Sequence, residues 1–253
     1  MKKKYTNINA ETIDRWVKEG WQWGIPISPE ACTEVRKGNW NVVLTPTRNV
    51  PKDWFPPLKN KKVLGLASGG GQQMPIFSLL GADCTVLDLS DQQLESERLV
   101  AAREGYDINI VKADMTEMLP FADNSFDLIF HPVSNCYIED VYHLWRECYR
   151  ILKPNGILLS GMDNGINYLF ENSEKSLTVT NKLPFNPLKN PEYMNLLEVE
   201  DSGVQFSHTF DEQIGGQLKA GFIIVGAYED YNTNDLTAEY RIPTFWATKA
   251  IKN

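Results

Sequence analysis

The chain has 253 residues, 42% of them hydrophobic, which is enough to bury the core of one large globular domain. Its net charge is −8 and no basic cluster marks a nucleic-acid-binding face, so we expect no nucleic-acid partner. Its apolar runs are too short to span a membrane, so we expect no membrane partner. Its four cysteines show no metal-ligand spacing, so we expect no metal and a cytoplasmic protein with reduced thiols.

The first 60 residues are expected to form an arm of two short helices and an irregular segment. Asn9 is a candidate N-cap for the first helix. Ser28 caps the second, and Gly38 ends it. The proline-rich stretch 45–57 excludes a central strand or helix. Five of the seven tryptophans lie in the arm: Trp16, Trp21, Trp23, Trp40 and Trp54. We expect them to pack the arm onto the core, and covering the substrate is their alternative role.

Between residues 61 and 162, predicted strands and helices alternate, which indicates a parallel sheet with helices on both faces. Pro75 lies in the first turn of one predicted helix, where no backbone donor is lost. A capping box at residues 90–93 begins another helix, which ends at Gly105. The five predicted strands cover residues 63–66, 85–88, 108–111, 126–130 and 157–160.

Residues 163–207 break this alternation, because they are polar, contain proline and are too long for an ordinary loop. We interpret them as an insertion near the mouth of the site. A second capping box, residues 209–212, predicts a helix that ends at Gly221. Two strands, 222–225 and 244–248, follow without a helix between them and predict an antiparallel pair at the sheet edge. The expected organisation is one domain with four parts: arm 1–60, core 61–162, insertion 163–207, and final helix and strand pair 208–253.

Three of the predicted strands end in residues suited to an adenosyl ligand. The glycine turn 69–71 lets a ligand approach the backbone, and the following helix offers free N–H groups. Asp88 ends the second strand, where an acid can accept hydrogen bonds from both ribose hydroxyls. Capping the next helix is the alternative role for Asp88, but Ser90 already supplies that cap. Asp114 and Met115 end the third strand, where they can contact the amine and the ring of adenine.

These motifs resemble those of the class I S-adenosylmethionine-dependent methyltransferases. The similarity covers roughly residues 60–162 and is carried by the runs 63–71, 87–90, 113–115, 119–129 and 152–156. The resemblance implies an α/β three-layer sandwich whose seven-stranded sheet is mostly parallel with an antiparallel edge strand. It also implies S-adenosylmethionine as cofactor and in-line methyl transfer, which we expect to go to a small-molecule acceptor.

The resemblance also indicates which residues surround the cofactor. His131 ends the fourth strand beside it, and Tyr137 follows where the methyl group should face its acceptor, so these two are the candidate catalytic residues. Packing or a structural hydrogen bond is the alternative role for both. Gln73, at a helix start, could orient the methionine part or lie at the surface. The candidate cofactor-binding residues are Ala67, Ser68, Gly69, Gln73, Asp88, Leu89, Gln93, Asp114, Met115 and His131.

Two positions depart from the family pattern. Gly65 stands where the family usually has an acid, and Ala67 stands where it usually has a glycine. The missing acid removes a partner for the cofactor's ammonium group. A residue of the N-terminal arm could replace it, or binding could be weaker.

Two other functions fit part of the sequence. A nicotinamide-dependent oxidoreductase would use residues 65–70 as a loose dinucleotide fingerprint, with Asp88 on the ribose. Its Tyr149 and Lys153 would form the Tyr-x-x-x-Lys pair of one dehydrogenase group, but a Pro-Asn-Gly turn ends the helix directly after Lys153, away from the strand ends where ligands bind. A non-catalytic cofactor-binding regulator is favoured by the missing acid and disfavoured by Asp88 and Asp114.

Overall fold

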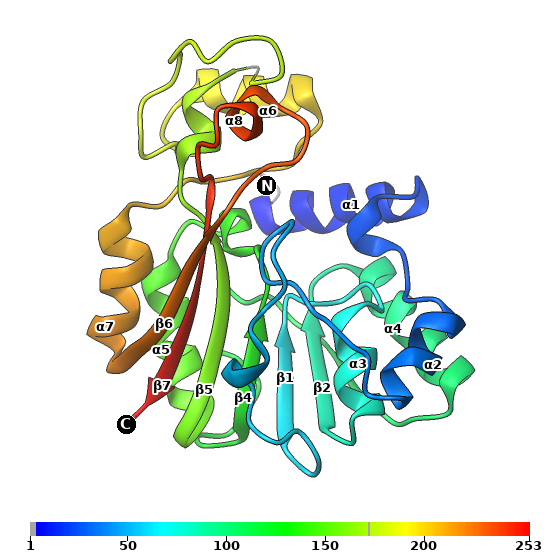
Figure 1. Ribbon diagram of the computed structural model, residues 1–253. Helices are drawn as coiled ribbons and strands as arrows, with labels where there is room; N and C mark the ends of the chain where they lie inside the picture. Colours follow the sequence, from blue (N-terminus) through cyan, green and yellow to red (C-terminus); the bar gives the residue numbers. More distant parts are fainter. Residues whose placement is uncertain (1–3, 172) are drawn as a thin grey trace.

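The computed structural model describes residues 4–171 and 173–253 and shows a seven-stranded sheet between two layers of helices (Figure 1). The strand order is β3-β2-β1-β4-β5-β7-β6. All seven predicted strands are present, and the predicted α/β fold is confirmed. The strands are β1 (Lys62–Leu66), β2 (Asp83–Asp88), β3 (Asn109–Lys112), β4 (Phe126–His131), β5 (Leu152–Asp163), β6 (Phe222–Asp230) and β7 (Phe245–Lys252).

The sheet order explains where a ligand can bind. From β1 the chain moves outward to β2 and β3, then returns to place β4 on the other side of β1. In such sheets ligands bind at the carboxyl ends of the strands, at this point of reversal. The last two strands form the expected antiparallel pair. The antiparallel strand itself is β7, one place in from the edge, because it pairs with both β5 and β6.

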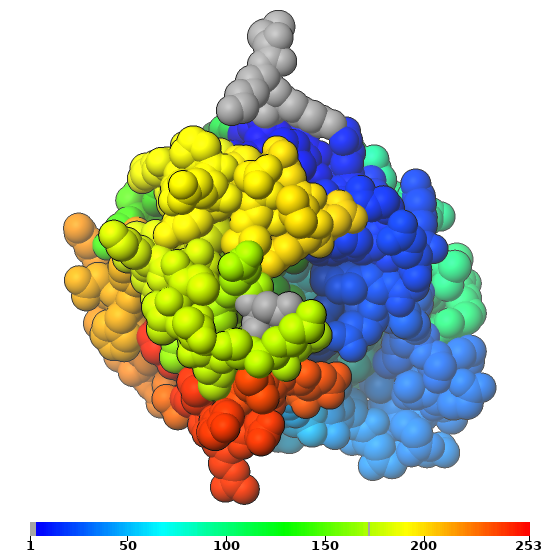
Figure 2. Space-filling model, turned by 90° about the horizontal axis from the view of Figure 1, so that it is seen from above, coloured from blue at the N-terminus to red at the C-terminus, as the bar shows by residue number. Residues whose placement is uncertain are grey.

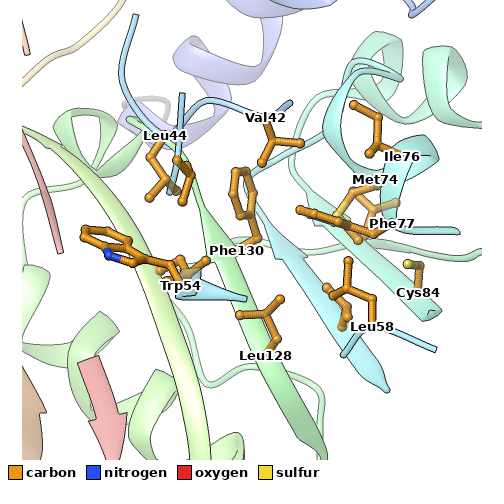
Figure 3. Packing of buried hydrophobic residues seen from close by; sticks show 14 of the residues in the cluster. Val42, Leu44, Trp54, Leu58, Met74, Ile76, Phe77, Cys84, Leu128 and Phe130 are labelled. Atoms are coloured by element: carbon orange, nitrogen blue, oxygen red, sulfur yellow. The ribbon is translucent and has the colours of Figure 1, made fainter. Parts of the chain in front are cut away.

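Helices bury both faces of the sheet, which is why β1 and β4 are apolar along nearly their whole length. Figure 3 shows the core on one face, where Phe77 meets Phe130 edge-on at 5.2 Å between ring centroids. On the other face Leu144 and Trp145 are fully buried. The main helices are α2 (Pro29–Arg36), α3 (Gln73–Leu79) and α4 (Asp91–Glu104) on the first face, and α5 (Val141–Ile151) and α7 (Gly216–Ala220) on the second.

Three predicted helix starts are confirmed by their side-chain caps. The Ser28 hydroxyl accepts a hydrogen bond from a backbone N–H at the start of α2, and Ser90 does the same at α4. Thr209 and Glu212 form a reciprocal capping box, in which each side chain accepts from the other residue's backbone N–H. The helix that follows begins as a π turn (Asp211–Gly215), continues as α7 and ends at Gly221, whose φ is +109°.

The prediction that Asn9 caps the first helix is wrong. Helix α1 (Tyr5–Lys18) begins one turn earlier, and Asn9 lies inside it. Its amide donates to the carbonyl oxygens of Tyr137 (3.1 Å) and Val204 (2.9 Å) and accepts from the N–H of Val204 (2.6 Å). Asn9 therefore fastens α1 to the loop after β4 and to the insertion.

The arm and the insertion both lie over the carboxyl end of the sheet. Helix α1 crosses this end, and residues 163–171 and 173–207 lie beside it (Figures 1 and 2). A short helix, α8 (Leu236–Glu239), separates the last two strands, where the sequence predicted none. The insertion contains α6 (Pro191–Glu200), and 3-10 turns lie at Gln22–Gly24, Lys52–Trp54, Asn135–Tyr137 and Ile166–Leu169. Within residues 4–171 and 173–253, no helix is both long and apolar enough to cross a membrane.

Candidate functional site

A cavity of about 270 Å³ lies at the carboxyl end of the sheet, where the loops after β1, β2, β3 and β4 meet the arm. The structure therefore brings the three strand ends chosen from the sequence around one space. The candidate residues that line it are Ala67, Ser68, Gly69, Gln73, Asp88, Leu89, Gln93, Asp114, Met115 and Tyr137. Among the described residues, no three His, Cys, Asp or Glu side chains come together to hold a metal ion.

The glycine turn after β1 is packed against the start of α4. A Cβ added at Gly69 would lie 2.7 Å from Cβ of Gln93 and 3.0 Å from Oδ2 of Asp88, so no larger residue fits there. Ala67 adopts the left-handed region at φ +47°, a conformation that costs an alanine roughly 1–2 kcal/mol. The turn is therefore a narrow backbone cradle, with its strain at the position where the family usually has glycine.

Asp88 is a buried acceptor at the end of β2. Its Oδ2 accepts from the N–H of Gly69 and its Oδ1 from the N–H of Ser90, both at 3.0 Å. Burial raises the pKa of its carboxyl group above the usual value, while these N–H groups act in the opposite direction. Each carboxylate oxygen has two acceptor sites, so both oxygens can still accept from a ribose diol. The residues present thus fit the ribose of an adenosyl cofactor.

Asp114 lines the cavity but is already well hydrogen-bonded. Its Oδ1 accepts from the N–H and hydroxyl of Thr116, and its Oδ2 accepts from Nζ of Lys4 at 2.9 Å. Burial favours a raised pKa, but the hydrogen bonds from Thr116 and Lys4 outweigh it, and the pKa of Asp114 is lowered. An adenine amine would share this carboxylate with Lys4, which lies at the start of α1.

His131 is the one candidate outside the cavity lining. Its ring is fully buried and lies edge-on to Trp145, on the α5 side of the sheet. Nδ1–H donates to the carbonyl oxygen of Leu66 at 2.9 Å, and burial lowers the pKa of His131 to about 4. Its Nε2 has no hydrogen-bond partner among the residues described. This position gives no support to the prediction that His131 contacts the cofactor or acts on the acceptor.

The arm supplies part of the cavity wall, and some of this wall comes from its tryptophans. Trp21 and Trp23 line the cavity, whereas Trp54 is buried in the core and Trp40 packs against that core. Gln72 ties the arm to the glycine turn, since its amide donates to the carbonyl oxygens of Gln22 (2.7 Å) and Ile25 (2.9 Å). The tryptophan density of the arm was the signal for this wall.

A second part of the arm crosses the ends of β4 and β5. Within this segment, residues 43–46, the carbonyl oxygen of Leu44 accepts from the N–H of Val133 at 3.0 Å. The same carbonyl lies where a Cβ of Gly161 would be, so the close approach requires glycine in β5. This crossing places Val43 and Thr45 in the cavity wall.

The position of the missing acid is filled by a thioether. A Cβ at Gly65 would overlap the sulfur of Met74, which is fully buried on α3. Among the described lining residues only Asp88 and Asp114 carry charge, so the arm supplies no carboxylate to replace the acid there.

Glu97 on α4 lies fully buried beneath the glycine turn. Its Oε1 accepts from the N–H of Gly71 at 2.8 Å, and its Oε2 is unpaired within the described part of the chain. Burial raises the pKa of Glu97 to about 8. The folded protein therefore keeps this group protonated at neutral pH, while the unfolded chain ionises it above about pH 4.5.

This buried proton predicts how stability depends on pH. Between about pH 5 and 8 the folded state binds one more proton at Glu97 than the unfolded state, so its contribution to the free energy of unfolding falls as pH rises, by at most about 1.4 kcal/mol per pH unit. In urea titrations, Glu97→Gln should gain stability relative to the parent across this range. Parallel pH curves for the two proteins would contradict the assignment.

A family model described as "Methyltransferase domain" matches residues 64–160. An uncharacterised methyltransferase of Bacillus subtilis, YbaJ, is 41% identical over 249 residues, which cover 96% of this chain and 97% of that protein. The sterol 24-C-methyltransferase of Aspergillus fumigatus is 33% identical over 99 residues, covering 38% of this chain and 26% of that protein. An S-adenosylmethionine-dependent methyltransferase structure from Mesorhizobium loti shares the fold, with a TM-score of 0.62, 21% identity, and coverage of 79% of this chain and 94% of that one.

Proposed function

Since this chain belongs to the class I S-adenosylmethionine-dependent methyltransferases, with S-adenosylmethionine as methyl donor, we propose that it methylates a small-molecule acceptor held between the arm and the loop after β4. The observation that carries this proposal is that three strand ends and the arm line one cavity. The absence of a basic cluster in this acidic chain also supports a small molecule over a nucleic acid as the acceptor.

The bound cofactor supplies a methyl group that its sulfonium already activates. The chain's part is to bind, orient and exclude water, which can provide much of the rate acceleration. In this proposal the glycine turn holds the methionine part, Asp88 the ribose, and Asp114 with Met115 the adenine. The wall formed by Trp21 and Trp23 keeps water out.

The oxidoreductase alternative is excluded by family membership, and its Tyr149 and Lys153 pair lies away from the cavity. The Tyr149 hydroxyl donates to the carbonyl oxygen of Asn253, and Nζ of Lys153 pairs with Asp127 at 2.6 Å. Asp127 also accepts from the N–H of Lys62, at the amino end of β1. The pair therefore lies at the opposite end of the sheet from the cavity.

We further propose that the chain works as one domain with the four parts given above. Support comes from the cavity wall, which draws on the arm, the core and the first residue of β7. The insertion reaches the site indirectly, through the contacts of Val204 with Asn9.

Calorimetry with S-adenosylhomocysteine, NAD and NADP tests the cofactor part of the proposal. We expect saturable one-to-one binding of S-adenosylhomocysteine and none of either nicotinamide. Transfer of labelled methyl from S-adenosylmethionine to members of a small-molecule panel then tests the reaction. Binding of NAD or NADP without binding of S-adenosylhomocysteine would refute the proposal.

A further inference from the structure

The cavity has two chemically different sides, which the sheet order defines. The ends of β3, β2 and β1 form the adenosyl side. The methyl group must then face the part of the wall that belongs to β4, β7 and the arm segment 43–46. We call this part the acceptor side. Its wall includes Thr45, Ser134, Cys136, Tyr137 and Phe245.

The acceptor side carries no charged side chain within the described residues. Both charged residues of the cavity, Asp88 and Asp114, belong to the adenosyl side. Burial raises the pKa of the Cys136 thiol to about 12 and that of the Tyr137 phenol still further, so both groups stay neutral. The acceptor side thus offers hydroxyls, a thiol and aromatic rings, but no base and no counter-ion.

We infer that the methyl acceptor is an uncharged, largely apolar molecule, and that its accepting atom attacks without giving a proton to this protein. The inference rests on the proposed methyl transfer. A carboxylate or an ammonium group on the acceptor would lose its water here and find no partner of opposite charge, which is a large penalty. An alcohol would lack the base it needs to become a nucleophile.

The electron balance of the transfer is met without a protein base. The acceptor's lone pair forms the new bond to the methyl carbon, and the carbon–sulfur electron pair returns to sulfur, which becomes a neutral thioether. The positive charge passes to the acceptor atom, and a proton on that atom then leaves to water. An unprotonated amine nitrogen or a thioether sulfur can react in this way.

Matched ligands test the charge preference directly. The protein is first saturated with S-adenosylhomocysteine, and then titrated with 3-phenylpropanamide, 3-phenylpropanoate and 3-phenylpropylammonium, which share a phenylpropyl skeleton and differ in charge. We expect the neutral amide to bind at least about tenfold more tightly than either ion. Equal or tighter binding of an ion, or no binding of the amide at millimolar concentration, overturns the inference.

An engineered charge on the acceptor side checks that the ligands bind there. Val43 lines this side and is partly exposed, so a polar replacement is tolerable. Val43→Asp should shift the preference toward the ammonium ligand, whereas Val43→Asn, with the same shape and no charge, should not. An unchanged preference in Val43→Asp overturns the inference. If the parent protein does not bind S-adenosylhomocysteine, the proposed function itself is refuted. Failure of the inference and failure of the proposed function therefore give different results.

Discussion

Asp88→Ala is expected to weaken S-adenosylhomocysteine binding by about 100-fold, as measured by calorimetry. The carboxylate is buried at the end of β2 and lines the cavity. In its proposed role it accepts hydrogen bonds from both ribose hydroxyls. Hydrogen bonds to a charged group contribute roughly 1.5–3 kcal/mol each, and a 100-fold loss corresponds to about 2.7 kcal/mol. The variant also frees the N–H groups of Gly69 and Ser90, so the glycine turn should loosen.

Two controls separate ribose binding from general damage near Asp88. Asp91→Ala removes an exposed carboxylate from the first turn of α4, where it pairs with Lys112, and should leave the dissociation constant nearly unchanged. Asp88→Asn keeps the shape but not the charge, and should fall between the parent and the alanine variant. If Asp88→Ala binds S-adenosylhomocysteine like the parent, the ribose assignment is wrong.

Gly65→Asp, which restores the family's usual acid, is expected to lower the free energy of unfolding by about 3 kcal/mol or more. The new Cβ overlaps the sulfur of Met74 in a fully buried layer, and overpacking of this kind costs typically 1–3 kcal/mol. A carboxylate placed there adds the cost of burying a charge without a partner. Urea unfolding monitored by tryptophan fluorescence measures the loss.

A double-mutant cycle tests whether the Met74 side chain is the cause. Met74→Ala alone should cost about 2–5 kcal/mol, as other large-to-small core changes do. Combined with Gly65→Asp it makes room for the acid, so the double variant should be more stable than the sum of the two losses predicts. Strict additivity would show that the two positions do not compete for space.

The strand–helix alternation was predictable because its signals are local. Apolar runs, the Ser28 and Ser90 caps and the Thr209–Glu212 box each lie within a few residues of the element they define. Asn9 shows where this fails, since its partners, Tyr137 and Val204, are 128 and 195 residues away along the chain. Asn9 has a side chain suited to capping, but that side chain forms its hydrogen bonds with residues that only the folded chain brings near it.

The candidate site likewise has parts that the sequence predicted and parts that it did not. The meeting of Gly69, Asp88 and Asp114 at one cavity was predictable, because parallel strands bring their carboxyl ends to one edge of the sheet, whatever the details of packing. The position of His131 was not, because its ring follows the alternation of β4 toward Trp145, opposite to Phe130. Of the acceptor side, the sequence indicated only Tyr137. The rest depends on the crossing of Leu44 over Gly161 and on the start of β7, which are contacts between distant segments that no local pattern predicts.

The contacts that hold α1 over the cavity affect how quickly the protein can exchange its product. Helix α1 forms part of the cavity wall and is joined to the insertion through Asn9 and through the ion pair of Arg15 with Asp201. Lys4 also pairs with Asp114 at the adenine end. If S-adenosylhomocysteine leaves past α1, these contacts must part first. In many enzymes an opening step of this kind, rather than bond formation, sets the turnover number.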